Sequence, residues 1–416
     1  MIRFLFVFAI FLLFVSACSK ANDNTIPVII VDTLIPVASI NLDANEQTIN
    51  GFGGATAFQP NLTDADIATL FANQNDNQLG LNILRIRIAP SDSTKWTTEL
   101  SNAVRAKNYG AIVMASPWTP PAYMKSNNNL IGGRLNSNFY PDYASYINGY
   151  SNYMRRRGGE LYAISIQNEP DWDATYESCL WSAKEMTTFI RGSQFNLGST
   201  KLLAAESFYF KQSFTDSILN DSLAASKLGI IGGHIYGGGL AYYFNAQYKG
   251  KNVWMTEHLD TATTWSAVIG TAKEIHNCLA VAKYNAYIWW YLKRYYGPID
   301  ESGKITKRGY IMAQFSKYIH SGYKRVDVSS PFASVLISAY KGGANQVVLV
   351  AINTSDSSKM IRFVFGNTSG GLFPTSLSTH ITSANKNLAS SINVNVVDSA
   401  FNYILPPSSV VTFTSN

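Results

Sequence analysis

The sequence predicts an α/β protein, in which a (β/α)8 barrel is followed by a small all-β domain. Two observations carry this prediction. Short apolar runs alternate with segments of helical composition eight times between Gly51 and Gly297. After about Gly322 the helical windows stop, and apolar residues recur with a period of two, which is typical of half-buried strands.

The eight apolar runs are the predicted strands of the barrel. They begin at Gly51, Asn82, Ala111, Tyr162, Lys201, Leu228, Asn252 and Ala286. Segments between them, such as 142–158 and 267–285, have a composition that favours helices. An open doubly wound sheet is the alternative, but "GFGG" lacks the G-x-G-x-x-G spacing of a dinucleotide-binding turn. We therefore expect a closed TIM barrel with its site at the C-terminal ends of the strands.

The all-β domain is predicted for residues 322–416. Its apolar runs begin at Ala333, Lys359, Ser391 and Ser408, and a turn at 342–345 divides the first of them. The segment 37–49 also has strand character. We expect it to join this domain, a β-sandwich, so that the barrel occupies residues 50–321.

The first 18 residues have the pattern of a signal peptide. Arg3 precedes an apolar run from Phe4 to Val15, which is too short for a comfortable membrane span. The following "VSAC" resembles a bacterial lipobox, in which Cys18 is lipidated and becomes the new N-terminus. Residues 19–36 then form a tether. We expect a lipoprotein anchored to a membrane of the bacterial cell envelope or surface. If Cys18 belongs to an ordinary cleavage site, the protein is periplasmic or secreted.

Composition narrows the function classes. Charged residues make up 14% of the chain, below the roughly 25% of typical proteins, and the net charge of +6 forms no dense Lys/Arg stripe. We therefore expect no nucleic-acid partner. Cys179 and Cys278 could form one disulfide or remain two buried thiols. The sequence has no Cys-x-x-Cys or His/Cys cluster, so we expect no metal or other cofactor, and we expect a monomer.

Two of the predicted strands end in a glutamate. The fourth run, "AISIQNEPDW", passes from apolar residues to Asn168 and Glu169, and the seventh ends at Glu257. A carboxylate at the edge of a core is expected to have a polar partner or a chemical function. One such function is glycoside hydrolysis, in which one carboxyl group is the general acid and the other is the nucleophile or base. A structural ion pair, for instance with Arg85, is the alternative for either glutamate alone.

Aromatic side chains stand at the ends of other predicted strands. Trp118 follows the third run, and His234 and Tyr236 end the sixth, where the histidine could equally be a satisfied core residue. Trp289 and Trp290 point to opposite faces of the eighth strand, so at most one is expected in the cleft. Flat rings suit the C–H faces of sugars, which favours a carbohydrate substrate.

The sequence resembles glycoside hydrolase family 30 over nearly the whole chain after the tether. The motifs are "GFGGA" from Gly51, "SPWTPPAYMKSNN" from Ser116, "QNEPDW" from Gln167 and "WMTEH" from Trp254. The stretch that begins "WWYLKRYYGPIDESG" at Trp289 is similar to the eighth strand and following loop of subfamily 8, the glucuronoxylanases. The resemblance implies a barrel with a β side domain packed against it.

The resemblance also implies functions for single residues. Glu169 matches the acid/base of the family and Glu257 its nucleophile. At the reacting sugar, Asn168 matches an amide that binds the 2-hydroxyl, and Trp118 matches an aromatic residue. Arg85 matches an arginine beside the nucleophile, and Tyr236 matches a tyrosine that touches the nucleophile.

Arg294 matches an arginine that pairs with the carboxylate of a (4-O-methyl)glucuronic acid branch on xylan. Trp290 and Tyr296 match residues of the same pocket. The planar guanidinium fits a carboxylate in a bidentate manner, although pairing with a protein carboxylate such as Asp300 or Glu301 is the alternative. Family members usually carry an aromatic residue where this chain has Leu259, so we expect part of the uronate pocket to be altered.

We therefore predict an endo-β-1,4-xylanase that hydrolyses glucuronoxylan by a retaining double displacement, with cleavage directed by the uronic acid branch. The alternatives within the family are a uronate-independent xylanase, a β-1,6-glucanase and a β-glucosidase. From another class, the alternative is a non-catalytic polysaccharide-binding surface lipoprotein, but binding alone requires neither Glu169 nor Glu257.

Overall fold

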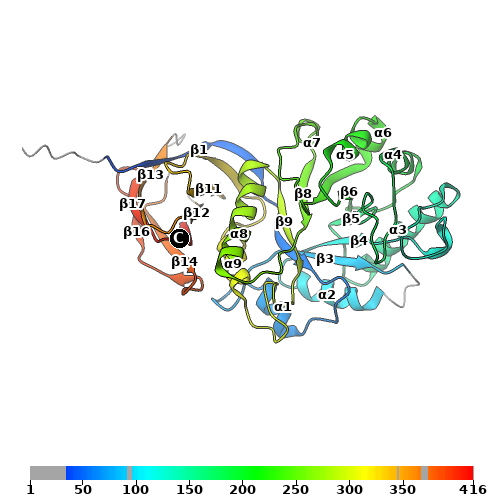
Figure 1. Cartoon of the computed structure of the whole chain (residues 1–416), viewed down its shortest axis with the longest axis horizontal. Helices are drawn as coiled ribbons and strands as arrows, with labels where there is room; N and C mark the ends of the chain where they lie inside the picture. The colour runs from blue at the N-terminus through cyan, green and yellow to red at the C-terminus, as the bar shows by residue number, and fades with distance from the viewer. Residues whose placement is uncertain (1–33, 91–95, 344–345, 367–372, 416) are drawn as a thin grey trace, which may run out of the picture. The chain divides into compact units, whose positions relative to one another are not determined.

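In the computed structural model, the described part of the chain comprises residues 34–90, 96–343, 346–366 and 373–415 (Figure 1). Cys18, the predicted signal peptide and most of the tether lie outside it, as does part of the turn predicted at 342–345. None of the helices in these ranges has the length and apolar character that a membrane span requires.

Eight parallel strands close into a barrel (Figure 1). They are β2 (Gly51–Ala55), β3 (Ile83–Ile88), β4 (Ile112–Pro117), β5 (Ala163–Ser165), β6 (Lys201–Ser207), β7 (Leu228–His234), β8 (Asn252–Glu257) and β9 (Ala286–Tyr291). Strand β2 pairs with β3 on one side and with β9 on the other, which closes the ring. The barrel prediction is therefore confirmed, and the open doubly wound sheet is excluded.

Helices connect the strands of the barrel. They are α1 (Asp64–Phe71), α2 (Thr97–Lys107), α3 (Tyr140–Arg156), α4 (Ala183–Gly192), α5 (Gln212–Leu219), α6 (Ser222–Lys227), α7 (Phe244–Tyr248), α8 (Trp265–His276) and α9 (Lys307–Ser316). Capping boxes begin two of them, with Thr63 paired to Asp66 at α1 and Ser182 paired to Glu185 at α4. These side chains satisfy free amide groups of the first turn and so fix where each helix starts.

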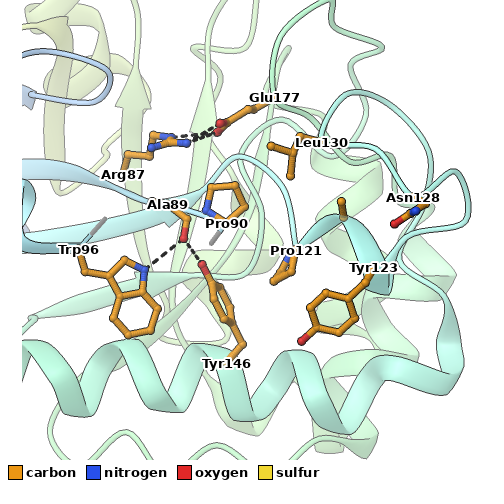
Figure 2. Close-up of a pocket in the computed structure, with 11 residues that line it drawn as sticks. Arg87, Ala89, Pro90, Trp96, Pro121, Tyr123, Asn128, Leu130, Tyr146 and Glu177 are labelled. Atoms are coloured by element: carbon orange, nitrogen blue, oxygen red, sulfur yellow. Dashed lines mark hydrogen bonds and ion pairs between the residues drawn. The ribbon is translucent and has the colours of Figure 1, made fainter. Parts of the chain in front are cut away.

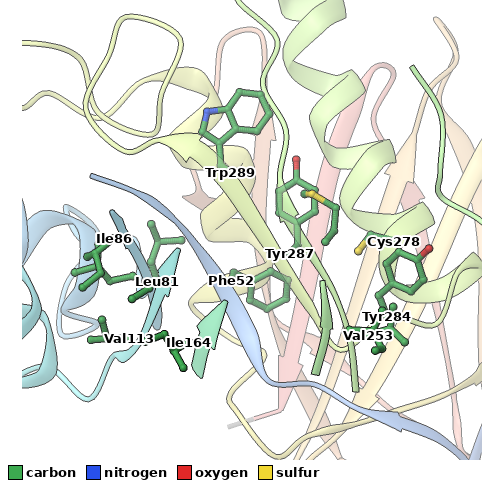
Figure 3. Close-up of a cluster of buried hydrophobic side chains, with 14 of the residues drawn as sticks. Phe52, Leu81, Ile86, Val113, Ile164, Val253, Cys278, Tyr284, Tyr287 and Trp289 are labelled. Carbon is green, nitrogen blue, oxygen red and sulfur yellow. The ribbon is translucent and has the colours of Figure 1, made fainter. Parts of the chain in front are cut away.

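Side chains fill the barrel below the site. Its inner cluster consists of Ile83, Met114, Ala163, Leu203, Ile230, Trp254, Ala286 and Ile288. Leu84 and Ile86 belong instead to the larger apolar cluster outside the barrel strands, and Figure 3 shows Ile86 among its members. Because successive strand residues point to opposite faces, Arg85 stands on the inner face, one layer above Ile83. The strand pattern thus brings a guanidinium to the centre of the barrel.

The all-β domain is one mixed sheet of ten strands in the order β15-β14-β18-β12-β11-β10-β1-β13-β17, with β16 beside β14. The strands are β1 (Val37–Thr48), β10 (Lys324–Val328), β11 (Val335–Lys341), β12 (Val347–Asn353), β13 (Lys359–Gly366), β14 (Ser376–Ser383), β15 (Ala389–Ser390), β16 (Val394–Asn395), β17 (Ala400–Leu405) and β18 (Ser409–Ser415). Strand β1 precedes the barrel in sequence but lies between β10 and β13, and its pairing with β13 is parallel.

This sheet folds over a core of its own. Phe363 on β13 and Phe413 on β18 are not on neighbouring strands, yet their ring centroids lie 5.4 Å apart. Phe401 on β17 stacks on Phe363 at 4.8 Å. The two ends of the sheet therefore face each other across an apolar layer, so the predicted all-β side domain is present as one folded sheet, a half-barrel.

The barrel and the β-domain share buried polar contacts. Gln314 on α9 donates through Nε2 to Thr382 Oγ1 at 2.8 Å, and Thr412 Oγ1 donates to the Gln314 carbonyl at 2.7 Å. All three side chains are buried. Helix α9 of the barrel therefore also packs against the β-domain.

The two cysteines after the tether are free thiols, and both are buried. Burial raises the pKa of Cys179 to about 12 and raises that of Cys278 well above its ordinary value. Of the two possibilities left open by the sequence, the structure shows unpaired thiols, which burial keeps in the unreactive protonated form.

Candidate active site

A cavity of about 490 Å³ opens among the ends of the barrel strands and the loops that follow them. Its lining residues are Phe58, Trp118, Glu169, Tyr176, Phe208, Tyr236, Glu257, Leu259, Trp290 and Tyr291. Both glutamates singled out in the sequence therefore line one cavity.

The two carboxyl groups lie close together. One oxygen of Glu169, one oxygen of Glu257 and one ring nitrogen of His234 all lie within 4.8 Å of one another. Retaining glycosidases hold their carboxyl groups about 5–5.5 Å apart, whereas inverting ones need about 6.5–9.5 Å to admit a water molecule. The spacing here suits direct attack by one carboxylate.

Arg85 is fully buried and joins several polar groups of the site. Its Nη1 donates to Glu257 Oε2 at 2.5 Å, and its Nη2 donates to Asn168 Oδ1 at 2.6 Å and to Glu206 Oε1 at 3.1 Å. These partners offset the cost of burying the guanidinium. The ion pair considered as an alternative for Glu257 thus exists, and it fixes the orientation of that carboxylate.

His234 and Glu206 form a second buried pair. His234 Nδ1 lies 2.9 Å from Glu169 Oε1, and His234 Nε2 lies 3.6 Å from Glu206 Oε1. Burial acts to lower the pKa of His234, but Glu257, Glu169 and Glu206 outweigh it and raise that pKa to about 9. Burial acts to raise the pKa of Glu206, but Arg85 and His234 lower it to about 2. His234 is therefore a charged member of the site and not a neutral core histidine.

Two tyrosine hydroxyls donate to the two carboxyl groups. Tyr236 donates to Glu257 Oε1 at 2.8 Å, and Tyr176 donates to Glu169 Oε2. Burial, followed by the neighbouring carboxylates, raises the pKa of both tyrosines, so both remain donors at neutral pH. Burial also raises the pKa of Glu257, and the nearby cations oppose that rise.

Irregular strand ends aim the carboxylates into the cavity. The register of β7 with β8 shifts just before Glu257, and that of β6 with β7 shifts at Glu206. Glu206 and Glu169 both have positive φ, of 53° and 48°. An extra residue in a strand turns the following side chain to the other face. Simple alternation from the inward-facing Leu203 or Trp254 would turn Glu206 and Glu257 outward.

Aromatic rings wall the cavity. The ring centroid of Trp118 lies 5.7 Å from that of Trp290 and 5.3 Å from that of Phe58. Trp289 is buried instead, with the Arg308 guanidinium 4.6 Å from its ring centroid. One of the two adjacent tryptophans therefore reaches the cavity, in keeping with the opposite directions of neighbours on a strand.

Arg294 lies in a neighbouring cavity of about 320 Å³, which shares Phe58 with the one that holds the two glutamates. Its side chain is half exposed, and Nη1 lies 3.9 Å from Glu301 Oε1. Such an exposed ion pair contributes little stability. Tyr296 is buried and lines neither of these cavities. Trp290 thus lines the cavity with the glutamates, whereas Arg294 adjoins that cavity through Tyr291, whose ring centroid lies 5.6 Å from the Arg294 guanidinium.

Some groups of the site were not identified from the sequence. Glu206 ends the apolar run "KLLAAES", and its inward direction depends on the strand irregularity. Tyr176 lies in the loop after β5 and has no periodic pattern around it. A carboxylate at the end of a fully apolar run needs a buried cation, and that argument could have linked Glu206 to Arg85. Phe58, Phe208 and Tyr291 complete the aromatic wall.

The donor atoms of Glu169, His234 and Glu257 are close enough for one metal ion to bind all three. The surrounding charges do not fit a resident metal. The pKa of about 9 keeps His234 protonated at neutral pH, and a histidine must be deprotonated to bind a metal. Arg85 already occupies one oxygen of Glu257. We assign no metal to these residues.

Comparison with known proteins places this site in a family. No protein-family model matches the chain. It is 38% identical over 395 residues to the glucuronoxylanase XynC of Bacillus subtilis (strain 168), with 91% of each chain covered. A glycoside hydrolase family 30 subfamily 8 xylanase from Clostridium acetobutylicum has a similar structure, with a TM-score of 0.87, 38% identity, and 92% of this chain and 100% of that chain covered. A family 30 endoxylanase from Clostridium papyrosolvens C71 has a TM-score of 0.83 at 37% identity, with 91% and 100% covered. From this similarity over almost its whole length, the chain belongs to glycoside hydrolase family 30, subfamily 8.

Proposed function

We propose that this chain is an endo-β-1,4-xylanase that hydrolyses glucuronoxylan with retention of configuration. The observation that carries the proposal is the pair of carboxyl groups on Glu169 and Glu257, with oxygens within 4.8 Å of each other. The similarity to a curated glucuronoxylanase over 91% of the chain supports the substrate. A protein that only binds polysaccharide would need no such pair.

The reaction proceeds in two displacements. Glu169 gives its proton to the glycosidic oxygen while an oxygen of Glu257 attacks the anomeric carbon. The bond to the leaving chain breaks, and a covalent glycosyl–enzyme forms. Glu169 then takes a proton from water, whose oxygen attacks the same carbon and releases Glu257. Two inversions at one carbon leave the configuration unchanged.

Neighbouring groups hold the nucleophile in place before the substrate arrives. Arg85 binds Oε2 of Glu257, and Tyr236 binds its Oε1. Both contacts come from buried or largely buried groups, so little reorganisation is needed during reaction. Asn168, whose amide oxygen is held by Arg85, can offer its NH2 group to the 2-hydroxyl of the reacting sugar.

The acid/base is held by a different pair. His234 lies 2.9 Å from Oε1 of Glu169, and Tyr176 donates to its Oε2. Trp118 and Trp290 supply flat apolar faces beside it for the sugar rings. The site therefore combines a preorganised carboxyl pair with aromatic platforms for a polysaccharide.

We further propose that Arg294 binds the carboxylate of the glucuronic acid branch. It lies in a cavity that shares Phe58 with the catalytic one, so a branch on a bound xylan chain can reach it. Its contact with Glu301, at 3.9 Å, leaves hydrogen-bonding capacity for an incoming carboxylate. Leu259 lines the catalytic cavity and offers that carboxylate no hydrogen bond.

Digestion of glucuronoxylan and unbranched xylan side by side tests this function. We expect faster release of products from glucuronoxylan, each with a branch at a fixed distance from its reducing end. Proton NMR during the first turnovers should show the β-anomer before mutarotation. Equal rates on both substrates would contradict the proposal that the enzyme recognises the glucuronic acid branch. First release of the α-anomer would remove the retaining mechanism, and Glu257→Gln should abolish turnover in either case.

We also propose that Cys18 is lipidated and anchors the enzyme, as a monomer, to a membrane of the cell envelope. The basis is the segment "VSAC" after an apolar run. The Cys18→Ala variant should move from the membrane fraction to the soluble fraction when cells are disrupted. Unchanged fractionation would point to simple secretion, and sedimentation of the soluble variant would report its oligomeric state.

A further inference from the structure

A second large cavity, of about 1000 Å³, lies beside the catalytic one, and the proposed reaction does not use it (Figure 2). Its walls come from α3 and from the segments that follow β3, β4 and β5. The lining residues are Arg87, Ala89, Pro90, Trp96, Pro121, Ala122, Tyr123, Asn128, Leu130, Tyr146 and Glu177. Most of these present apolar surface.

One side of this cavity is held rigidly. Trp96 donates through Nε1 to the Ala89 carbonyl at 3.1 Å, and the Tyr146 hydroxyl donates to the same oxygen (Figure 2). The two rings contact each other edge to face, with centroids 5.8 Å apart. Because their polar atoms are already partnered, these residues contribute carbon surface to the cavity.

The opposite side is also fixed, although it is a loop. Ile131 forms a strand-like bridge with Glu177, and the Ser178 amide donates to the Leu130 carbonyl at 3.0 Å. The buried Lys125 donates through Nζ to the Ser178 carbonyl at 2.6 Å. The segment that carries Asn128 and Leu130 is therefore bound to the segment that carries Glu177.

An ion pair forms the boundary between the two cavities. Arg87 and Glu177 bond in a fork, with Nε to Oε2 at 2.9 Å and Nη2 to Oε1 at 2.5 Å. The Arg87 guanidinium lies 4.5 Å from the ring centroid of Phe58, which lines the catalytic cavity. Glu177 directly follows Tyr176, the residue that donates to Glu169. The second cavity is thus separated from the reacting groups by one layer of side chains.

Tyr123 stands at the rim with 62% of its surface exposed. Figure 2 shows it across the cavity from Trp96. Its ring is braced by an edge contact with Phe139, with centroids 5.9 Å apart. A braced aromatic ring that remains largely exposed beside a fixed cavity is typical of a binding surface.

We infer that this cavity binds further sugar units of the same xylan chain whose scissile bond lies between Glu169 and Glu257. The inference rests on the proposed function, because only a polymeric substrate would cross from one cavity to the next. Rings and prolines suit the C–H faces of sugars, and the Arg87–Glu177 pair offers donors and acceptors to hydroxyl groups at the boundary. The occupant is therefore the substrate chain itself and not a separate small molecule.

Chain-length dependence provides the test. The substrates are oligosaccharides with one glucuronic acid branch, extended by one, two or three xylose units at either end. For Tyr123→Ala we expect kcat/KM to fall about threefold to tenfold on the extended substrates. The value should not change on the shortest substrate that is still cleaved. Tyr109→Ala is the matched control, because Tyr109 is 45% exposed and lies at the end of α2, away from either cavity.

Binding provides a second readout that does not depend on turnover. In a Glu257→Gln background, calorimetry should show weaker binding of the extended oligosaccharides after Tyr123→Ala and unchanged binding of the short one. Equal effects on all lengths, or no effect on any, would overturn the inference. Failure of the wild-type enzyme to cleave any of these substrates would instead overturn the proposed function, so the two failures are distinguishable.

Discussion

Five ionisable groups share one buried cluster in the active site. Arg85 and His234 carry positive charge among Glu169, Glu206 and Glu257, and all five side chains are buried. Each charge is tolerable only because the others neutralise it, and removal of one partner leaves an unpaired buried charge. Single-residue changes here should therefore alter pH behaviour as well as rate.

His234 should make stability depend on pH in the alkaline range. Its pKa is about 9 in the folded protein, against an ordinary value of 6.5. A raised folded-state pKa contributes stability that is full below pH 6.5, declines as the pH rises, and is lost above about 9. Urea unfolding between pH 6 and about 10 should show this decline, and His234→Gln should reduce it. The same slope in both proteins would contradict the assignment of the charge to His234.

Glu206 should act by positioning, because it contacts Arg85 and His234 and lines no part of the catalytic cavity. Glu206→Gln should lower kcat about tenfold or more with little change in KM, since it weakens contacts that hold the reacting carboxylates. The NMR-measured pKa of His234 should also fall. Glu99→Gln is the control, because Glu99 is another buried glutamate but bonds to Thr56. An unchanged His234 pKa in Glu206→Gln would contradict this reasoning.

Replacement of Arg294 should lower kcat/KM on glucuronoxylan and leave it unchanged on unbranched xylan. Loss of a charge-assisted contact worth roughly 1.5–3 kcal/mol should lower kcat/KM on glucuronoxylan about tenfold to a few hundredfold in Arg294→Ala. On unbranched xylan the arginine has no ligand, so the value should not change. Arg294→Lys should recover only part of the loss, because an ammonium cannot reproduce the fork. Equal losses on both substrates would mean that Arg294 acts structurally.

At the scale of elements, the strand ends decide which side chains meet. Alternation of apolar runs predicted all eight barrel strands, and the polar residues that end them pointed to Glu169 and Glu257. The inward direction of Glu206 and of Glu257 depends on register shifts that alternation does not predict, and the family resemblance identified only Glu257. Tyr176 depends on how a loop folds back over the barrel, which no local pattern encodes. Sequence periodicity thus predicts regular strands well and their irregular ends poorly.

The first barrel strand depends on a close backbone approach. A Cβ atom on Gly53 would lie 1.9 Å from the carbonyl oxygen of Ile83 on the neighbouring strand, which cannot move aside without breaking the barrel register. Gly53→Ala should therefore lower the free energy of unfolding by about 3 kcal/mol or more, measured by urea titration. Gly270→Ala is the control, because Gly270 lies within α8 with open space around it. That change should stabilise the helix by up to about 1 kcal/mol, and similar losses in both variants would contradict the packing argument.

At the scale of the whole molecule, the path of the chain joins its two domains. Strand β1 enters the side sheet before the barrel begins, and the remaining strands of that sheet follow the barrel. The sheet therefore cannot be completed without both ends of the described chain. Buried contacts of Gln314 with Thr382 and Thr412 add a polar connection through α9.

This arrangement predicts one cooperative unfolding transition for the barrel and the β-domain together. Unfolding of the barrel would release α9 and uncover the residues of β14 and β18 that pack against it, so the β-domain is less stable alone than in the intact protein. Scanning calorimetry of the chain without its first 33 residues should show a single peak whose calorimetric and van't Hoff enthalpies agree. Gln314→Ala removes the side-chain hydrogen bonds to Thr382 and Thr412, although Thr412 keeps its bond to the backbone carbonyl of residue 314. The change should lower the midpoint by about 2–4 °C for each kcal/mol lost while keeping one peak. Two resolved peaks in either protein would show that the domains unfold independently and that the shared contacts do not couple them.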